Sequence, residues 1–587
     1  MTQTSRAEGF VPPTLDAASF EELSPLIQEL LGRTLASTSE LERWLHDRSD
    51  LLAAISEGRA RLYIASTCNT DDQAAQEAYA SYVEHVAPKL SPMFFELDKK
   101  LVQAARVCPL PPRYAVLLRN AQADVELFRP ENVPLETDLA KLGQQYDQIV
   151  GAMTVEFDGQ TRTLPQMSVF QESPDRTIRE RAWRTVADRR LHDHAAISDV
   201  FDRMISLRHK VGVNAGFESY VGYAYKSFHR FDYGPAQCER FHAGVEAAFV
   251  PLMRELDKDR AAKLHLPALR PWDLGVDVLG RGPLKPFDGG ADLVAKSRVV
   301  FRRLDPRLAA LFEQLGDGRG RVRSAADPGG AKLDLDSRRG KAPGGYQYML
   351  ERSRVPFIFM NAAGVHKDVQ TMVHEAGHAF HSMLCVDEPL VEYRSSPIEF
   401  AEVASMSMEL LTMKHLGPGE AGRAFYDDPE SLRRACRDQL KRAVTVLPWI
   451  ATIDAYQHWL YANPTHTRDQ RAAFWLSLDE RFGSKLDWSG LDQARRLSWQ
   501  RQMHLFSHPF YYIEYGIAQL GALQLWLHSL EKSETSAIEH YIKALSLGGS
   551  RPLPELFKAA GLVFDFGPET LMRLADRVRL ELAKFPE

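Results

Sequence analysis

The stretch DVQTMVHEAGHAFHSMLC, from Asp368 to Cys385, decides how this chain is interpreted. Its apolar residues recur at intervals of three and four, which predicts a helix that begins at an N-capping Asp368. His374 and His378 then lie on one helix face, because residues four apart rise only about 6 Å. Two imidazole nitrogens placed in this way can bind one metal ion, and Glu375 beside them can take a proton from a water molecule. The pattern predicts a metal-binding helix.

The surroundings of this motif separate a functional match from a chance one, since the chain contains 19 histidines. The run VPFIFMN, from Val355 to Asn361, is apolar, rich in β-branched and aromatic residues, and followed by Ala-Ala-Gly. These features predict a strand and a turn directly before the helix. A second helix that carries carboxylates follows downstream. We therefore interpret the motif as functional.

A catalytic zinc site needs a third protein ligand and an open position for water. His381 shares the helix face, but a third ligand about 10 Å along the same helix fits a tetrahedral site poorly. A metzincin would have a histidine ten residues after the first one, and Leu384 occupies that position. The segment PIEFAEVASMSMELL predicts a second helix with three acids, Glu399, Glu402 and Glu409. Periodicity alone leaves the first two nearly equal as third ligand.

The remaining sequence indicates a mainly helical protein. Residues 15–255 predict successive helical segments, and helices return from the metal motif to the end of the chain. Between about 264 and 346, a high density of Gly and Pro favours turns and the short strands of a small sheet. We expect an N-terminal helical domain over residues 1–200 and a catalytic domain over residues 201–587.

The charge balance argues against nucleic acid as a main partner. The chain has 72 Lys and Arg against 78 Asp and Glu, a net charge of -6, and no basic block. The first ten residues, MTQTSRAEGF, are polar, and no run of about 18 apolar residues occurs. We therefore expect no membrane partner and a cytoplasmic location.

The cysteines give no sign of a disulfide framework or of a zinc site with cysteine ligands. They are odd in number, far apart in the sequence and form no CxxC pair. We expect them to be reduced and mostly buried. They are Cys68, Cys108, Cys238, Cys385 and Cys436.

Four segments carry a resemblance to a known family. They are GKAPGGY (340–346), FIFMNAAG together with TMVHEAGHAFH (357–381), EFAEVAS (399–405) and HLFSHPFYYIEYGIAQLGAL (504–523). In these segments the chain resembles the thimet-type oligopeptidases, peptidase family M3, and most closely their oligoendopeptidase F branch.

The resemblance implies a mainly helical, two-lobed shell around a deep substrate channel, with a small β-sheet beside the zinc helix. It also implies that Glu402, within the pattern of Phe400, Glu402 and Ser405, is the third ligand of a single Zn²⁺ ion. Members of this family cleave short unstructured peptides, because the channel excludes folded proteins.

The last segment is implied to lie over the metal. Preorganised Tyr O–H and His N–H donors stabilise the oxyanion that forms when water attacks a peptide carbonyl. We favour His504 and Tyr515 in this role and leave Tyr511 and Tyr512 open, since tyrosines at this spacing also commonly belong to a core.

The predicted strand before the metal helix has a second expected role. If it lies at an exposed sheet edge, an extended peptide can pair with it through main-chain hydrogen bonds, which tolerates many side chains. The Gly-rich loop before it lies near the substrate in this interpretation, although a plain turn explains that loop equally well. The expected substrate-binding residues are Phe359, Asn361, Ala362, Gly364, Gly345 and Tyr346.

The sequence thus predicts a zinc-dependent oligoendopeptidase with Glu375 as general base, acting on short peptides as a monomer or a homodimer. Cobalt or manganese would also suit two imidazoles and a carboxylate. Two alternatives remain open: a metallocarboxypeptidase of related helical fold, and a catalytically silent peptide-binding scaffold.

Overall fold

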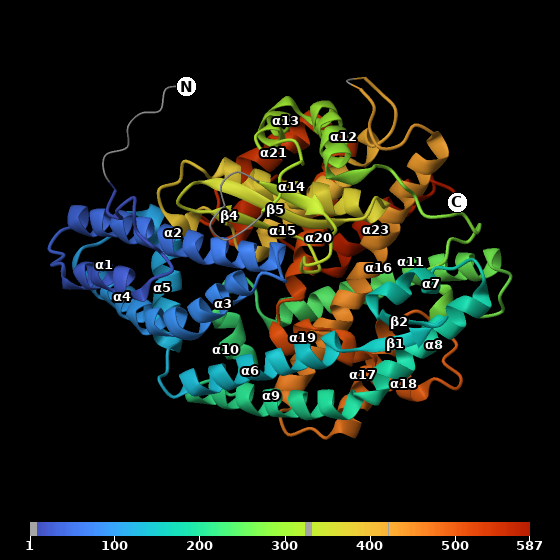
Figure 1. Ribbon diagram of the computed structural model, residues 1–587, viewed down its shortest axis with the longest axis horizontal. Helices are drawn as coiled ribbons and strands as arrows, with labels where there is room; N and C mark the ends of the chain where they lie inside the picture. Colours follow the sequence, from blue (N-terminus) through green and yellow to red (C-terminus); the bar gives the residue numbers. More distant parts are fainter. Residues whose placement is uncertain (1–8, 323–331, 421) are drawn as a thin grey trace. The chain divides into compact units, whose positions relative to one another are not determined.

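A computed structural model describes residues 9–322, 332–420 and 422–587 of the chain (Figure 1). Within these ranges the chain is mainly helical with two small sheets, as the sequence predicts. The first eight residues of the polar N-terminal stretch, and residues 323–331 of the Gly- and Pro-rich region, lie outside the described parts. Among the described helices, none combines the length and apolar character needed to cross a bilayer. All five cysteines are free and buried.

The described chain divides into two compact units, each built from three separate segments. The first comprises Met1–Glu126, Leu284–Cys436 and Gly521–Phe564, and the second comprises the remainder. The expected division near residue 200 is wrong, because that residue lies inside the uninterrupted helix α9 (His194–Asn214), where no linker exists.

The first unit contains a three-stranded sheet together with helices that precede and follow it in sequence. Its elements are α1 (Phe20–Gly32), α2 (Thr38–Cys68), α3 (Gln73–Ser81), α4 (Ala87–Val107), α12 (Gly289–Leu304), α13 (Pro306–Glu313), β3 (Leu333–Asp336), β4 (Tyr346–Leu350), β5 (Val355–Ala362), α14 (His366–Leu384), α15 (Ile398–Leu411), α21 (Glu534–Leu545) and α22 (Leu553–Ala559).

The second unit contains a β-hairpin and a further set of helices. Its elements are α6 (Asn132–Gly151), β1 (Thr154–Phe157), β2 (Gln160–Thr163), α7 (Ser168–Gln171), α8 (Arg176–His192), α9, α10 (Tyr220–Ser227), α11 (Pro235–Lys263), α17 (Arg468–Phe482), α18 (Asp492–Arg496), α19 (His504–Ser507) and α23 (Pro568–Leu582). Three helices contain residues of both units: α5 (Ala115–Leu127), α16 (Pro429–Ala462) and α20 (Ile513–Glu531).

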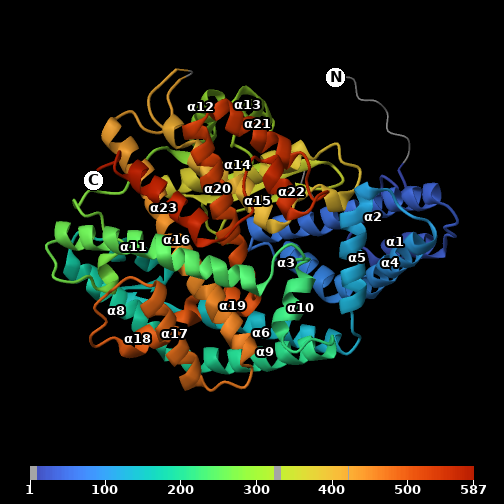
Figure 2. The ribbon, with the colours of Figure 1, turned by 180° about the vertical axis from the view of Figure 1, so that it is seen from behind.

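The sheet of the first unit supports the helix that carries the predicted metal motif. Its strand order is β3-β5-β4, with β3 parallel and β4 antiparallel to β5. The middle strand is apolar on both faces: Phe357, Ile358 and Phe359 are all buried, as expected for a strand covered from two sides. Helix α14 packs against β4 and β5, and α15 packs against α14 (Figure 1). Seen from behind, α21 and α22 lie beside α15 (Figure 2).

Two departures from the expected secondary structure have local causes. The Gly- and Pro-rich region contains the helices α12 and α13 as well as strands, because its Gly and Pro residues flank runs with helical periodicity. Asp305 separates the two helices and caps α13 by accepting hydrogen bonds from the N–H groups of Arg307 and Leu308. The hairpin of β1 and β2 interrupts the predicted helical run, and its turn places Asp158 and Gly159 at positive φ.

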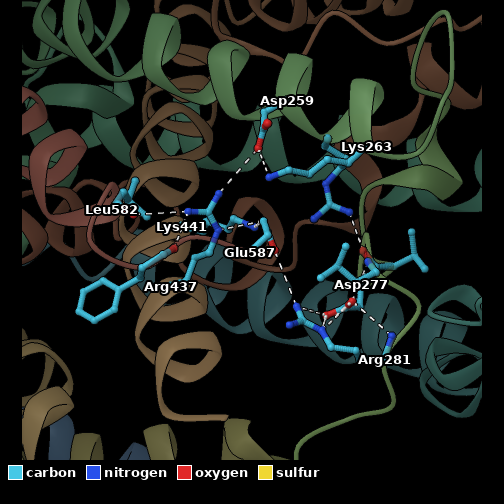
Figure 3. Close-up of polar contacts among 12 residues, drawn as sticks. Asp259, Lys263, Asp277, Arg281, Arg437, Lys441, Leu582 and Glu587 are labelled. Atoms are coloured by element: carbon cyan, nitrogen blue, oxygen red, sulfur yellow. Dashed lines mark hydrogen bonds and ion pairs between the residues drawn. The ribbon is translucent and has the colours of Figure 1, made fainter. Parts of the chain in front are cut away.

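In the second unit, α11 and α23 pack side by side (Figure 2). Beyond α23, the carboxylate of Glu587 lies among three cationic side chains (Figure 3). It pairs with Arg437 at 2.8 Å, with Lys441, and at 3.9 Å with Arg281. Burial raises the pKa of Glu587, but these cations outweigh burial and lower it to about 2. This cluster ties the segment after α23 to helix α16.

Candidate metal and active site

Helix α14 carries the predicted metal motif and begins at His366 rather than at Asp368. The carboxylate of Asp368 lies in the first turn and accepts hydrogen bonds from the backbone N–H groups of Ala363 at 2.8 Å and Val365 at 3.0 Å. The prediction that Asp368 is the N-cap is therefore wrong by one turn, although the side chain still satisfies backbone donors at this helix end.

The two helices of the site approach closely because of one glycine in the motif. A Cβ atom at Gly377 would lie 2.6 Å from the carbonyl oxygen of Ala404 and 2.6 Å from the Cα of Ser405. Real side chains do not tolerate such distances, so only glycine allows α14 and α15 to pack at this point. The contact lies one turn beyond Glu402 on α15 and thereby brings this carboxylate to the histidines.

The ligand atoms of His374, His378 and Glu402 converge, and all lie within 4.8 Å of one another. Glu402 Oε2 is 3.4 Å from His374 Nε2 and 3.7 Å from His378 Nε2. Ligands of a tetrahedral zinc at 2.0–2.1 Å stand about 3.4 Å apart, so the donor set fits such an ion. Ser405 Oγ donates to Glu402 Oε2 at 3.0 Å and holds the carboxylate in this position.

Glu409 is a site residue to which sequence reasoning gave no role. Its Oε1 lies 2.7 Å from His374 Nδ1, so the imidazole carries its proton on Nδ1 and turns Nε2 toward Glu402. The available signal was the spacing of Glu402 and Glu409. Seven residues are two helical turns, which places both acids on the same face of α15.

The site is rich in buried negative charge. Burial is the largest cause that raises the pKa of Glu375. The carboxylates of Glu402 and Glu409 raise it as well, His374 opposes them, and the resulting pKa is about 7. At His374, burial disfavours the imidazolium, but the hydrogen bond with Glu409 and the nearby carboxylates outweigh it and raise the pKa to about 10. Three carboxylates within one buried group favour a bound cation.

His381 does not belong to the ligand group. It is buried, and its Nε2 lies 3.0 Å from the hydroxyl of Ser396, which also donates to the backbone oxygen of Gly548. This hydrogen bond accounts for a polar side chain inside the first unit.

The expected exposed edge at residues 357–361 is wrong. Strand β5 is the middle strand of its sheet and pairs with β3 on one side and β4 on the other. Among the described residues, β4 has a strand partner on one side only. The pairing places Tyr346 opposite Phe359. Strands β3 and β4 are both edge strands of this sheet, and β4 is the one that directly follows Gly345, beside Glu375.

The residues expected to bind substrate differ in burial and in hydrogen bonding, and not all of them can contact a peptide. Phe359 is fully buried, stacks on Tyr346 with ring centroids 4.7 Å apart, and cannot reach a substrate. The hydroxyl of Tyr346 lies 2.6 Å from that of Thr67. The amide of Asn361 donates to the backbone oxygens of Ala342 and Gly344, so it braces the loop before β4.

Three further positions are backbone features. Ala362 is buried, and its carbonyl oxygen accepts a hydrogen bond from the N–H of Ser337. Gly364 has φ +85 in the turn between β5 and α14. Gly345 lies beside the candidate base, because a Cβ atom there would be 3.9 Å from Glu375 Oε1. Of the six expected residues, Gly345 has the position best suited to a substrate backbone near Glu375.

The aromatic cluster of the last segment belongs to the second unit. The ring of His504 lies 4.9 Å from that of Tyr512, 6.0 Å from Tyr511 and 6.1 Å from Tyr515, centroid to centroid. All four side chains are partly exposed. The structure thus brings the four side chains together within the second unit.

A hydrogen-bonded chain sets the tautomer of His504. The indole N–H of Trp449, which can only donate, donates to Gln502 Oε1 at 3.2 Å. Gln502 Nε2 is therefore the group that faces His504 Nδ1 at 2.8 Å, and it donates there. Burial lowers the pKa of His504 to about 4. A neutral imidazole that accepts at Nδ1 carries its proton on Nε2, so His504 offers one N–H donor.

The site has the arrangement typical of a metallopeptidase: one helix carries two histidines with a glutamate between them, and a second helix supplies another glutamate. Comparison with known proteins identifies the family. A family model described as Peptidase family M3 matches residues 169–276 and 328–571. The chain belongs to this family and is a peptidase, which confirms the resemblance seen in the sequence.

Individual relatives agree with this assignment. An oligoendopeptidase F homolog of Borreliella burgdorferi is 26% identical over 209 residues, which cover 34% of this chain and only 33% of that protein. The solved structure of PZ peptidase A with inhibitor 2 is similar over 99% of both chains, with 25% identity and a TM-score of 0.85. A protein provisionally assigned as oligoendopeptidase F matches 98% of this chain and 99% of its own, with 25% identity and a TM-score of 0.83.

Proposed function

We propose that this M3 peptidase is a zinc-dependent oligoendopeptidase that hydrolyses internal bonds of short, unstructured peptides. The observation that carries the proposal is the convergence of His374, His378 and Glu402 beside the buried carboxyl group of Glu375. The two imidazoles and the carboxylate would hold one Zn²⁺ ion, with His374 oriented by Glu409. A bound zinc ion would polarise the scissile carbonyl and make a water molecule more acidic.

Glu375 is the general base in this mechanism. Its carboxylate takes a proton from the attacking water and delivers it to the amide nitrogen as the peptide bond breaks. Burial supports this role, because a carboxyl group with a pKa near neutrality both accepts and releases a proton readily. His504 and Tyr515 donate hydrogen bonds to the developing oxyanion, with Tyr511 and Tyr512 as further candidates. The neutral Nε2–H tautomer of His504 supports this assignment.

Peptide recognition involves the edge of β4 and the backbone at Gly345. Main-chain pairing with β4 would align an extended peptide across the sheet that supports α14. Because such pairing reads the backbone rather than the side chains, we expect broad sequence tolerance. Asn361 contributes by holding the loop before β4, not by direct contact.

Replacing Glu375 by Gln tests the mechanism. The variant should bind zinc like the wild type and lose at least about 1,000-fold in kcat/KM on a quenched peptide, since the base is absent but the ligands remain. Wild-type turnover by this variant would refute the assignment of Glu375.

The third ligand has a matched control on the same helix. Glu402→Gln should lower zinc content sharply, whereas Glu399→Gln should retain it, because Glu402 and not Glu399 belongs to the converging group. Equal zinc content in the two variants would contradict this ligand set.

A mass-spectrometric digest of one unstructured peptide, with and without a chelator, separates the alternatives. Internal cuts that disappear with the chelator support the proposal. Stepwise loss of C-terminal residues would indicate a metallocarboxypeptidase, and an intact peptide in the presence of zinc would indicate a silent scaffold. The oligomeric state and the cellular location stay predictions.

A further inference from the structure

A second group of ligand-type side chains lies in the second unit, within helices α10, α11 and α16. Cys238 and His242 are four residues apart on α11, and Asp454 and His458 are four residues apart on α16. Each pair therefore presents two polar side chains on one helix face. The carboxylate of Asp454 lies 2.8 Å from His242 Nε2, so the two pairs face each other.

The ligand atoms of Cys238, Asp454 and His458 lie within 4.8 Å of one another. Both Cys238 and Asp454 are buried, with exposed fractions of 1% and 0%. Zinc sites combine these three donor types, thiolate sulfur, carboxylate oxygen and imidazole nitrogen. The spacing of the group and its burial match those of a closed site rather than of a solvated surface cluster.

One oxygen of Asp454 has no protein partner. Its Oδ2 contacts His242 and lies 3.5 Å from His458 Nε2, whereas its Oδ1 is buried and accepts no hydrogen bond. A fully buried carboxylate oxygen without a partner costs free energy, so native proteins rarely leave one unused. This carboxylate therefore has room for one more donor or cation beyond His242 and His458.

The hydroxyl of Tyr225 supplies a fourth candidate donor atom. It lies 2.9 Å from Cys238 Sγ and 3.2 Å from His458 Nε2. It thus contacts two of the three candidate ligands and either completes a four-coordinate group or fixes the two ligands by hydrogen bonds. His242 contacts the same carboxylate oxygen that lies near His458 and so holds Asp454 in place, as groups around a metal ligand commonly do.

We propose that Cys238, Asp454 and His458 form a second metal site, which takes a zinc-like divalent cation and links α11 to α16. Binding replaces the proton of the Cys238 thiol, which leaves to solvent, so thiolate and carboxylate together neutralise the dication. Since the ligands come from two helices and are largely buried, the site is structural rather than catalytic. No sequence motif indicates this group, because Cys238 lies more than 200 residues from Asp454 and His458 along the chain.

The competing explanation is a metal-free hydrogen-bonded network. In this network, the imidazoles of His242 and His458 both lie next to the carboxylate of Asp454, and the thiol of Cys238 forms a hydrogen bond with the hydroxyl of Tyr225. Burial raises the pKa of Cys238 well above its usual range, so the thiol keeps its proton in that state. The two explanations differ in whether sulfur ever contacts a metal ion.

Cobalt substitution reports directly on sulfur ligation. The full-length protein is stripped with a chelator and titrated with Co²⁺ while its ultraviolet and visible spectrum is recorded. We expect a thiolate-to-cobalt charge-transfer band, to which the active site cannot contribute because its ligands are nitrogen and oxygen. Wild-type protein that binds cobalt without this band would overturn the proposal.

Variants locate the sulfur. Cys238→Ala should abolish the band and reduce bound zinc from about two ions to about one per chain. Cys436→Ala is the matched control, because Cys436 is also buried on α16 but belongs to neither ligand group among the described residues. A band that persists in Cys238→Ala, or that Cys436→Ala removes, would refute the site.

His458→Gln decides the question if Cys238→Ala fails to fold. This variant keeps the sulfur and a polar side chain of similar length, and its fold is checked by circular dichroism of the metal-free protein. We expect the cobalt affinity of the sulfur-containing site to fall by about tenfold or more. Unchanged affinity together with an unchanged charge-transfer band would contradict the role of His458.

Discussion

The hydrogen bond between Glu409 and His374 allows a quantitative prediction about metal affinity. Glu409 Oε1 accepts from His374 Nδ1 at 2.7 Å, while the Nε2 of the same ring lies 3.4 Å from Glu402 Oε2. Glu409→Ala would leave the Nδ1–H group without this acceptor and remove a negative charge next to a metal ligand. Glu409→Gln would keep an acceptor of the same length and remove the charge alone.

The expected magnitude follows from the surroundings of the pair. Loss of such an orienting partner typically weakens metal binding by about 10–100-fold, or about 1.4–2.8 kcal/mol. The side chains of His374 and Glu409 are 22% and 14% exposed, so water can replace only part of the lost hydrogen bond. We therefore expect about 100-fold weaker zinc binding for Glu409→Ala and about tenfold for Glu409→Gln.

Competition against a chromophoric chelator measures these affinities, and kcat/KM at saturating zinc separates binding from chemistry. Glu399→Ala is the control on the same helix and should bind zinc like the wild type. The melting temperatures of the metal-free variants show whether α15 itself is disturbed. If Glu409→Ala binds zinc as tightly as the wild type, Glu409 does not position His374.

Three further perturbations test other parts of the structure. Gly377→Ala should lower the free energy of unfolding by about 1–3 kcal/mol in chemical denaturation, because the new Cβ would meet the backbone of α15. Gly143→Ala is the control: its Cβ would meet nothing within 4 Å, so this variant should be more stable by about 0.4–1 kcal/mol. Glu587, whose pKa is lowered to about 2, contributes stability that is fully present above its unfolded pKa of 4.5 and is lost as the pH falls toward 2. Glu587→Gln should therefore cost up to about 3 kcal/mol at pH 7 and progressively less below pH 4.5, and a difference from wild type that is constant with pH would contradict this. Gln502→Glu should make Nδ1 of His504 a hydrogen-bond donor and raise the pKa of His504 above its present value of about 4. It should also lower kcat by about tenfold or more. An unchanged titration of His504 by NMR would refute the tautomer assignment.

Local patterns in the sequence predicted the elements that depend on neighbouring residues. Helix α14, strand β5 and the placement of His374 and His378 on one helix face follow from spacings of at most a few residues, and the structure has these elements where expected. Glu402 required more, because periodicity left Glu399 equal to it and only the family pattern favoured one. The close contact at Gly377 supplies the physical reason that the sequence alone did not reveal.

The errors concern features that depend on distant parts of the chain. Strand β5 looked like an edge because its pairing with β3 and β4 cannot be inferred from its own residues. The expected domain boundary near residue 200 does not appear, because each compact unit is built from three segments that are far apart in the sequence. The seven-residue spacing places Glu409 on the same helix face as Glu402, but this spacing does not show whether its side chain contacts His374 or solvent.

The two groups of candidate metal ligands have the same local arrangement on a helix but different surroundings. On α14, and again on α16, two side chains four residues apart project from one helix face, and a neighbouring helix supplies the third ligand. In the first group the glutamate between the two histidines can act as a base, and the histidines remain partly exposed. In the second group no such base accompanies the pair, and two of the three ligands are fully enclosed. In the two proposals the same spacing serves catalysis in one unit and cross-linking of helices in the other, and accessibility to water and substrate is the difference between them.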